Sequence, residues 1–436
     1  MNSPSPADWC EVLLDDVADE VTVGYVGSMT QEYIEKGIPW LRSKNVEPFN
    51  IDWNDMKYVS EDFHRKLSKS ALRPGDVVIV RTGKPGAAAL IPDSLAVANC
   101  SDLVIVRCGK KLDKRFCVYY LNSAAKHHIH SHLVGAVQQH FNVGAAKKLK
   151  INLPPIEEQR AIASILGALD DKIELNRRMN ATLESLARAI FKSWFVDFDP
   201  VKINAGQMPA DFYDPTLLSL FPSTFQDSEL GPIPEGWEIT TIDEVVESVG
   251  GATPSTKKSE FWEGGTLPWA TPKDLSGLQA PILVETDRRI TELGAGKISS
   301  GMLPAGTVLM SSRAPVGYLA IATMPVAINQ GFIAIKPNER VSQFFMLNWC
   351  QENMDRIKGR AGGTTFPEIS KKNFRPMKIC VPPANLVQAF TDLVRPVYDS
   401  IAEQVNESRT LSQQRDVLLP QLLSGKLPVV LEEMNV

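Results

Sequence analysis

Apolar residues recur in alternating steps of four and three along two stretches of the chain. The first stretch follows Pro155, extends for about 40 residues, and contains no proline before Pro200 and a single glycine. A heptad spacing of this kind places one apolar stripe along one side of an α-helix. The same spacing returns 228 residues later. The pattern therefore predicts two long helices, which we assign to 154–198 and 382–425.

Both predicted stripes are interrupted by polar residues at matched positions. Asn176 and Asn180 interrupt the first stripe, and Gln404 and Ser408 interrupt the second at the same offset of 228. Polar residues in a coiled-coil seam lower stability but fix register and the choice of partner. We therefore predict that the two helices pair with each other. The predicted helix-pairing residues are Ile162, Leu166, Leu169, Ile173, Asn176, Asn180, Leu183, Ile190 and Trp194 in the first helix, and Phe390, Val394, Val397, Ile401, Gln404, Ser408, Leu411, Leu418 and Leu422 in the second.

We expect an antiparallel coiled coil centred on the polar residues. A helix of this length is about 60 Å long, so the pair would act as a ruler that holds two domains at a fixed distance. The alternative is that each helix packs separately on its own domain. The antiparallel arrangement would bring together Asn176 with Ser408, Asn180 with Gln404, Ile162 with Leu422, and Trp194 with Phe390.

The segments that precede the two helices are diverged copies of one domain. Their matches shift by a few residues and then shift back, as small insertions between two copies produce. We assign the first domain to 1–153 and the second to 236–381, with a proline-rich linker at 199–235 and a tail at 426–436. The matching landmarks, at offsets of 228 to 231, are Trp9 with Trp237, Gly75 with Gly306, Gly86 with Gly317, and Asn99 with Asn329.

Each copy contains apolar runs of strand length that end near Gly or Pro. Helices are predicted after these runs, at 115–134 and 342–358. The fold class is therefore α+β, with two mixed, strand-rich domains that are each followed by a long helix, and with pseudo-two-fold symmetry if the helices pair. The predicted strands lie at 77–83 and 103–108 in the first copy and at 307–313 and 331–337 in the second.

Composition places the chain among water-soluble proteins of a reducing compartment. It has no apolar run long enough to cross a bilayer, and its first residues lack the basic and apolar regions of a signal peptide. The six cysteines form no CxxC pair. The net charge of −5 is unusual for a protein that binds DNA by itself. Basic residues are therefore expected to gather on one face, or partner subunits to supply part of the grip.

The chain carries none of the motifs that would mark it as an enzyme. Residues 294–300 (GAGKISS) resemble a phosphate-binding loop, but Ile298 stands where Ser or Thr is required. No DPPY- or NPPF-like tetrapeptide, GxSxG or HExxH is present. A histidine cluster has no carboxylate or cysteine at a ligand spacing, so we predict a solvated or DNA-facing surface there, with neither metal nor catalytic residues. The cluster consists of His127, His128, His130 and His132.

Polar loop residues at matched places in the two copies are candidates for reading DNA. Base edges are read by Arg, Lys, Asn, Gln, Ser and Thr side chains on loops and strand ends. The scaffold residues agree between the copies, whereas these polar residues differ, which favours two domains that read two different sequences. The candidates are Arg42, Lys44, Asn45, Arg81, Thr82, Lys84, Gln138, Gln139, His140 and Asn142 in the first copy, and Thr271, Lys273, Ser311, Ser312, Arg313, Gln330, Thr364 and Thr365 in the second.

The segment from Pro154 to Pro200 resembles the central region of specificity (S) subunits of type I restriction-modification enzymes. Its distinctive parts are the opening PP-x-EEQ-x-x-IA-x-x-L and the close KSWFVDFDP. The second copy, with LLSGKL at 422–427, resembles the distal region of that family. It departs from the pattern by carrying ANLVQAF where the first copy has IEEQRAI.

The resemblance implies a DNA-binding subunit without catalysis of its own. Two target-recognition domains would each read one half of a split, asymmetric site in double-stranded DNA. The helices, with charged residues such as Asp170 on their faces, would set the gap and dock two methyltransferase subunits. S-adenosylmethionine, ATP and Mg²⁺ would be bound by those subunits and by nuclease-translocase subunits, in a cytoplasmic complex for phage defence. The alternatives are a specificity subunit of a fused nuclease-methyltransferase system and a structural adaptor that binds no DNA.

Overall fold

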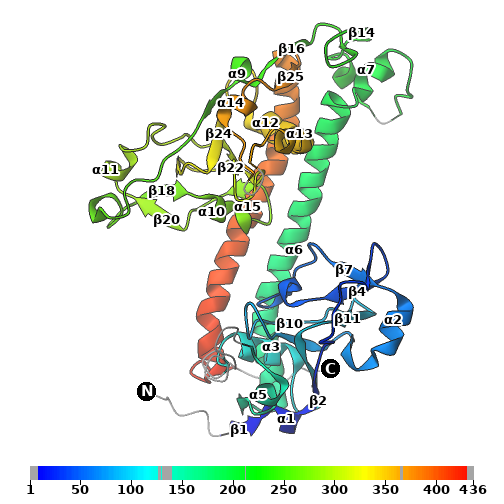
Figure 1. Ribbon diagram of the computed structural model, residues 1–436, viewed down its shortest axis with the longest axis vertical. Coiled ribbons are helices and arrows are strands. Elements are labelled where there is room, and N and C mark those ends of the chain that lie inside the picture. Colours follow the sequence, from blue (N-terminus) through cyan, green and yellow to red (C-terminus); the bar gives the residue numbers. More distant parts are fainter. Residues whose placement is uncertain (1–7, 126–128, 130–139, 212, 364–366, 430–436) are drawn as a thin grey trace. The chain divides into compact units, whose positions relative to one another are not determined.

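The computed structural model describes residues 8–125, 129, 140–211, 213–363 and 367–429. The chain divides into two compact units, one made of 1–172 with 410–436 and the other of 173–409. Each unit contains one strand-rich domain, and the long helices α6 (Ile156–Phe195) and α15 (Ala384–Leu423) contribute to both units (Figure 1). The predicted α+β class with two strand-rich domains and long helices is confirmed.

In the first domain a four-stranded sheet is buried on both faces. Its strand order is β10-β9-β12-β2. Val77 and Ile79 of β9 belong to one apolar cluster and Val78 and Val80 to another, because successive side chains of a strand point to opposite faces. The described strands and helices of this domain are β1 (Cys10–Leu13), α1 (Leu14–Val17), β2 (Ala18–Val23), β3 (Tyr33–Ile34), β4 (Ile38–Leu41), η1 (Ser43–Asn45), β5 (Val46–Glu47), β6 (Asn50–Ile51), β7 (Lys57–Val59), α2 (Glu61–Lys66), η2 (Ser68–Ser70), β8 (Ala71–Leu72), β9 (Val77–Val80), β10 (Ala88–Leu90), β11 (Ala98–Cys100), β12 (Leu103–Cys108), α3 (Lys114–Asn122), α5 (Val143–Lys147) and β13 (Lys150–Leu153).

The second domain repeats this arrangement. Val308 and Met310 of β21 face one cluster, and Leu309 faces another. The described elements between the long helices are α7 (Asp199–Asn204), α8 (Pro215–Leu218), β14 (Phe225–Gln226), β15 (Ile233–Pro234), β16 (Glu238–Thr241), α9 (Ile242–Val245), β17 (Glu247–Val249), η3 (Ser259–Phe261), β18 (Leu267–Ala270), α10 (Pro272–Ser276), β19 (Ile282–Leu283), β20 (Arg288–Ile290), α11 (Glu292–Ala295), β21 (Val308–Ser311), β22 (Leu319–Ala322), β23 (Ala327–Ile328), β24 (Phe332–Lys336), α12 (Gln343–Glu352), α13 (Met354–Gly359), α14 (Lys371–Phe374) and β25 (Lys378–Val381).

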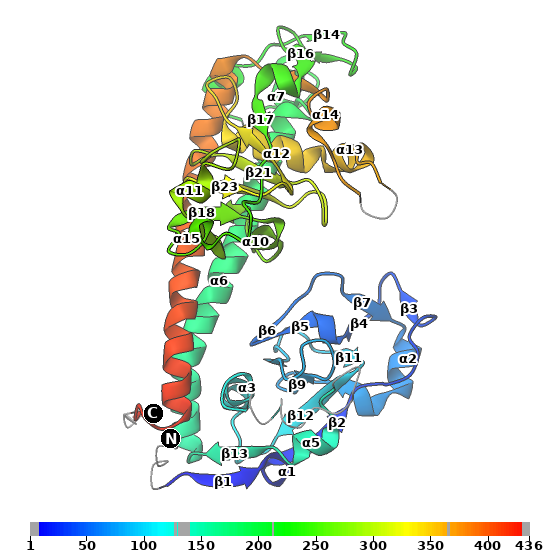
Figure 2. The same cartoon turned by 60° about the vertical axis from the view of Figure 1, so that its left-hand side comes forward.

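A second sheet in each domain carries the loops of interest, with five strands in the first domain and three in the second. In the first domain it has the order β3-β7-β4-β11-β8, and in the second β20-β18-β23. In both sheets one pair of strands is parallel, β4 with β11 and β18 with β23. An antiparallel pair of terminal strands connects each domain to its long helix, β1 with β13 (Figure 2) and β16 with β25 (Figure 1). The duplication seen in the sequence therefore extends to strand pairing.

Three expectations from the sequence need correction. The helix expected at 115–134 ends at Asn122, and 126–128 and 130–139 lie outside the described residues. The helix expected at 342–358 is interrupted at Asn353 between α12 and α13. The expected linker 199–235 is folded, because its prolines separate α7, α8 and the β14–β15 ribbon. Its residues Val201, Phe221 and Ile233 are buried in the main core of the second unit.

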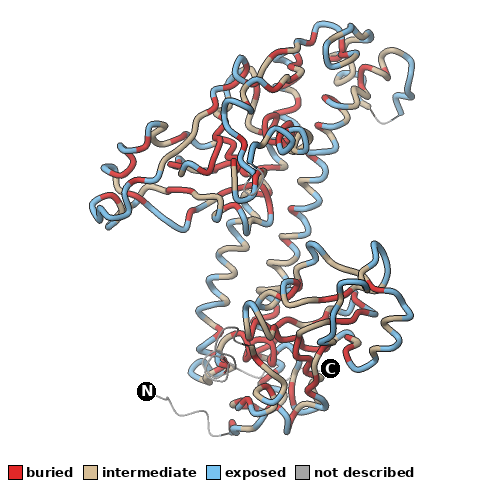
Figure 3. Tube along the Cα trace, in the orientation of Figure 1, coloured by how far each residue is buried: buried red, intermediate tan, exposed pale blue. Residues whose placement is uncertain are grey.

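The seam positions of α6 and α15 are buried or half-buried (Figure 3). In the first unit, Ile162 and Leu166 share a core cluster with Leu422. In the second unit, the rings of Trp194 and Phe390 lie 6.0 Å apart. The predicted neighbours Ile162 and Leu422, and Trp194 and Phe390, therefore belong to common cores.

The polar residue Asn176 also lies where the pattern placed it. Its Nδ2 donates to Ser408 Oγ (3.2 Å), Glu407 Oε2 (2.7 Å) and the carbonyl oxygen of Gln404 (3.5 Å). One amide on α6 therefore contacts three residues on neighbouring turns of α15, two of which, Gln404 and Ser408, are predicted seam residues. No helix among the described residues is both long enough and apolar enough to cross a membrane.

Candidate nucleic-acid interface

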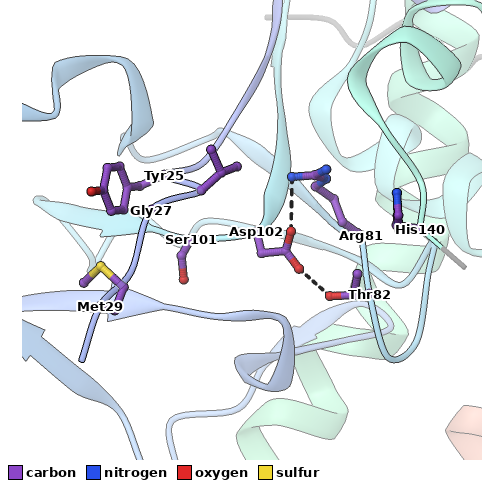
Figure 4. A pocket seen from close by; sticks show the side chains of 9 residues that line it. Tyr25, Gly27, Met29, Arg81, Thr82, Ser101, Asp102 and His140 are labelled. Atoms are coloured by element: carbon purple, nitrogen blue, oxygen red, sulfur yellow. Dashed lines mark hydrogen bonds and ion pairs between the residues drawn. The ribbon is translucent and has the colours of Figure 1, made fainter. Parts of the chain in front are cut away.

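The first domain has an open hollow at the ends of its buried strands. Arg81 and Thr82 follow β9 directly, and Ser101 and Asp102 form the turn through which the chain passes from β11 in the five-stranded sheet to β12 in the four-stranded sheet. The hollow has a volume of about 530 Å³. Figure 4 shows its residues; its lining consists of Tyr25, Val26, Gly27, Met29, Arg81, Thr82, Ser101, Asp102 and His140.

The second domain has a hollow in the equivalent place. Its volume is about 430 Å³, and Arg313 enters it from the end of β21 as Thr82 does from β9. The backbone N–H of Asn329 donates to the carbonyl oxygen of Ala270, as that of Ser101 donates to Leu41. The full lining is Thr271, Pro272, Lys273, Ser276, Arg313, Ala314, Asn329 and Gly331. Two domains of one fold therefore present the same surface feature with different side chains.

This backbone register corrects one match drawn from the sequence. Asn329 corresponds to Ser101 and not to Asn99. The side chain of Asn99 is buried, and its Nδ2 contacts His64 Nδ1 and the Leu67 carbonyl oxygen, each at 3.2 Å. Asn99 is therefore part of the scaffold, whereas Asn329 lines the second hollow.

A carboxylate organises the first hollow. Asp102 accepts an ion pair from Arg81 (3.1 Å) and a hydrogen bond from the Thr82 hydroxyl (Figure 4). Its backbone adopts φ = 54°, a left-handed conformation that Asp tolerates better than most residues. Asp102 thereby fixes two of the predicted base-reading side chains. Arg81 is only 17% exposed, so its guanidinium is held in place before any ligand arrives.

All the candidate Lys and Arg residues described here are paired with carboxylates. Lys84 pairs with Glu47, and Arg313 lies 3.7 Å from Glu368. Lys44 and Arg42 both contact Asp55, and Lys273 contacts Asp287 at 3.0 Å. The cations are exposed to different degrees, but each has an anionic neighbour. This pairing lowers the positive electrostatic potential that a DNA phosphate would experience at these loops.

Several candidate residues are part of the scaffold instead of the surface. Asn45 is buried and donates to the carbonyl oxygens of Asp52 and Asn54. Ser311 is buried, donates to Pro315 and accepts from the Gly317 and Tyr318 N–H groups. Small polar residues stabilise turns with the same groups that would read bases. These placements assign Asn45 and Ser311 a structural role.

Helix caps account for two more candidates. Asn142 caps α5 by accepting from the Ala145 N–H at 2.8 Å. Thr271 caps α10, and both its N–H and its hydroxyl donate to Asp274 Oδ2 at 2.7 Å. Thr271 nevertheless lines the second hollow, whereas Asn142 is absent from the lining of the first.

The remaining candidates differ in how far they are buried. Ser312 is buried, and its backbone bonds to Gly331 and Ile369. Gln330 is exposed and accepts a hydrogen bond from the Thr253 hydroxyl at 2.6 Å. His140 lines the first hollow. Candidates outside the described residues are Gln138, Gln139, Thr364, Thr365 and the cluster His127, His128, His130 and His132.

Sequence reasoning missed two apolar residues of the first hollow and the acidic residues that pair with the candidate cations. Tyr25 and Met29 enter the first hollow from the loop after β2, which has no matched polar motif. Asp55, Asp102 and Asp287 were missed because a search for phosphate and base ligands favours donors over carboxylates. Among the described residues, no group of three His, Cys, Asp or Glu side chains is placed to hold a metal ion.

A comparison with known protein families matches both domains. The family model for the type I restriction modification DNA specificity domain matches residues 6–185 and 234–407, one copy after the other. The chain belongs to the specificity subunits of type I restriction-modification systems. Its two matched regions coincide with the two strand-rich domains and large parts of the long helices. The chain is therefore a DNA-binding subunit with two target-recognition domains.

Specificity subunits of other organisms align with much of the chain. The HindI specificity subunit of Haemophilus influenzae is 28% identical over 327 residues, which cover 65% of this chain and 70% of that protein. The putative MjaX specificity subunit of Methanocaldococcus jannaschii is 24% identical over 97% of this chain and 95% of its own length. The crystal structure of the type I S subunit from M. genitalium has the same fold, with a TM-score of 0.56, 15% identity and 97% coverage of both chains.

Proposed function

We propose that each strand-rich domain reads one half of a split, asymmetric DNA site. The observation that carries this proposal is the repeated hollow, built from equivalent loops of one fold but lined by different side chains. Equal scaffolds place their reading residues in equal positions, and different side chains at those positions select different bases. The chain would then recognise two unlike half-sites.

The lining residues suit base recognition in the major groove. Arg pairs with the two acceptors of guanine, and Asn pairs with the acceptor and donor of adenine. Arg81 in the first hollow and Arg313 with Asn329 in the second supply these groups. Arg81 is oriented by Asp102, which reduces the entropy lost when DNA binds. His140 and Lys273 add contacts at the rims.

We further propose that α6 and α15 form an antiparallel coiled coil with pseudo-two-fold symmetry, which sets the spacing between the half-sites. Support comes from the Asn176 hydrogen bonds to α15 and from the cores that each helix shares with the other. The antiparallel direction is supported too, because residues near the start of α6 contact residues near the end of α15.

The helices also offer a surface for partner subunits. Leu175, Met179 and Leu186 of α6 are 50%, 42% and 50% exposed, and their spacing of four and seven places them on one helix face. We propose that this face docks methyltransferase subunits, two per complex. Asp170 does not belong to it, because that carboxylate is only 22% exposed and pairs with Arg415.

In the proposed complex this chain binds DNA and its partners perform the chemistry. The methyltransferase subunits would bind S-adenosylmethionine, and nuclease-translocase subunits would use ATP and Mg²⁺, all in the cytoplasm. The role of this chain's own residues is to recognise the site and to position the partners on it.

Selection from random duplex DNA tests the reading of two half-sites. The full chain, assembled with its methyltransferase subunits, should enrich one bipartite sequence. Arg81→Ala should relax the preference at bases of one half only, and Arg313→Ala at bases of the other half only, each by about 1–3 kcal/mol per lost contact. Arg160→Ala is the control, since that exposed arginine pairs with Glu157 on the outer face of α6. No enrichment by the intact complex, or relaxation of both halves by one variant, would refute the proposal.

A further inference from the structure

One acid–base pair recurs in the two domains at the same place in the fold. Lys44 pairs with Asp55 in the first domain, and Lys273 pairs with Asp287 at 3.0 Å in the second. Each lysine lies in the short helical turn after the parallel strand, η1 after β4 or α10 after β18. Each aspartate lies at the entry to the strand that pairs antiparallel with it, β7 or β20. We call these the lysine–aspartate pairs.

The surrounding loops hold each pair together with different chemistry. In the first domain Asn45 at the third position of the turn donates to the carbonyl oxygens of Asp52 and Asn54. In the second domain Asp274 at the same position accepts from the Asp287 N–H at 2.7 Å. Donor and acceptor are exchanged, yet both side chains tie the lysine's turn to the aspartate's loop. The two copies keep the pair although the residues that support it have changed.

Both aspartates are accessible to solvent. Asp55 is 50% exposed and Asp287 63%, and their lysines are 53% and 81% exposed. Hydrogen bonds from Lys44 and Lys57 hold the pKa of Asp55 well below its usual value, so it stays ionised. Exposed ion pairs of this kind are worth about 0–1 kcal/mol and therefore open readily. Such a pair contributes little to the free energy of folding, but it reduces the positive charge that is available to DNA phosphates.

We propose that Asp55 and Asp287 compete with DNA phosphates for Lys44 and Lys273, and that they thereby hold down the sequence-independent affinity of each domain. The inference rests on the proposed reading of DNA by these domains. Sequence-independent binding comes from lysines and arginines that neutralise phosphates. A lysine that must first leave a carboxylate contributes less to it, and the carboxylate itself repels the backbone. Lys273 lines the second hollow, so the competition acts at the reading surface.

The first domain should depend on its carboxylate more than the second. Asp55 contacts three cations, namely Lys44, Lys57 and, at 3.4 Å, Arg42. Asp287 is paired with Lys273 alone among the ion pairs of the described residues. Removing the charge of Asp55 should therefore free more positive charge than removing that of Asp287.

Fluorescence anisotropy with a random-sequence duplex of 30 base pairs tests the proposal on the full chain. Asp55→Asn should tighten binding about two- to fivefold, and Asp287→Asn by less, in line with the strength of exposed pairs. The slope of log affinity against log salt should steepen by up to about 0.9 for each lysine freed. Glu11→Gln is the matched control, because it also removes one charge from an exposed pair, with Lys150.

A second variant tests the mechanism itself. In Asp287→Asn with Lys273→Gln, the gain in affinity should disappear, because the freed ammonium is gone. Equal affinities and slopes for Asp55→Asn, Asp287→Asn and Glu11→Gln would overturn the inference. That failure is distinct from failure of the proposed function, which is judged by whether the wild-type complex enriches any sequence. Thermal melting verifies that the variants fold, since exposed pairs are worth at most about 1 kcal/mol.

Discussion

Glu184 on α6 forms an incompletely satisfied contact with Gln351 on α12. Gln351 Nε2 donates to Glu184 Oε1 at 2.8 Å, but Gln351 Oε1 is buried without a hydrogen-bond partner among the described residues. Desolvation by burial raises the pKa of Glu184 above its ordinary 4.5. Burial therefore makes the charged form of the Glu184 carboxylate less favourable than it is in water.

Glu184→Gln should stabilise the protein at neutral pH by about 1 kcal/mol, because it removes a half-buried charge and can keep accepting from Gln351 Nε2 through its amide oxygen. A carboxyl with a raised folded pKa contributes stability below its unfolded pKa and loses it as pH rises through the folded value. The advantage of the variant should therefore grow as pH rises from 4 to 7. Urea unfolding at several pH values measures this. A pH-independent difference, or a less stable variant at pH 7, would contradict it.

Single residues were also where sequence reasoning was weakest. Asn45 and Ser311 carry the groups that read bases, and the same groups satisfy turns, so composition alone cannot separate the two uses. Burial and hydrogen-bond partners decide whether such a group stabilises a turn or is free to read a base, and both depend on how the loops fold. Asn99 was matched to Asn329 on identity, whereas backbone hydrogen bonds match Ser101 to Asn329. Polar residue types on loops therefore predicted where the candidate interface lies better than they predicted which single residues line it.

Elements were predicted better, because their patterns extend over many residues. The long helices were expected at 154–198 and 382–425 and lie at Ile156–Phe195 and Ala384–Leu423. Forty residues of heptad spacing average out local exceptions, and prolines mark both starts. The segment 199–235 shows the opposite case. Its prolines suggested a linker, but short helices and a ribbon tolerate proline at their ends.

In the first unit an ion pair joins α6 to α15, and the apolar seam does not predict it. Arg415 donates to Asp170 at 2.7 Å, lies 4.4 Å from the ring centroid of Phe49, and is 15% exposed. Asp170 also accepts from the Tyr119 hydroxyl at 2.7 Å. This network connects both long helices to the first domain. Asp170 and Arg415 are both largely removed from water, so each needs the other as its counter-ion.

Asp170→Leu should lower the free energy of unfolding by about 1–3 kcal/mol, because Arg415 keeps a half-buried charge with only Asp416 left as its counter-ion. Asp170→Leu combined with Arg415→Leu should recover more than half of that loss, because an apolar pair replaces the ion pair. Urea unfolding of the full chain gives both values. Glu157→Ala, which breaks an exposed pair with Arg160, should change stability by less than about 0.5 kcal/mol. A double variant no more stable than Asp170→Leu would argue against the pair as the cause.

At the scale of the molecule, one domain design occurs twice and each long helix contributes to both units. The domains share a parallel strand pair, a terminal strand pair and the lysine–aspartate pairs, and they differ in the lining of the hollows. Under the proposed function, half-site identity therefore depends on the domains and half-site spacing on the helices. These two properties should change independently.

Inserting seven residues into α6 after Asn180 and seven into α15 before Gln404 tests that independence. A heptad in both helices preserves the apolar register and lengthens each helix by about 10 Å. At about 3.4 Å per base pair, the unread spacer between the half-sites should grow by about three base pairs. Selection from random duplex DNA with the complete complex reads out spacer and half-sites together. Unchanged half-sites with a longer spacer are expected, because the inserted residues lie outside both hollows. An unchanged spacer would show that the helices do not set it, and an altered half-site sequence would show that reading and spacing are not separate.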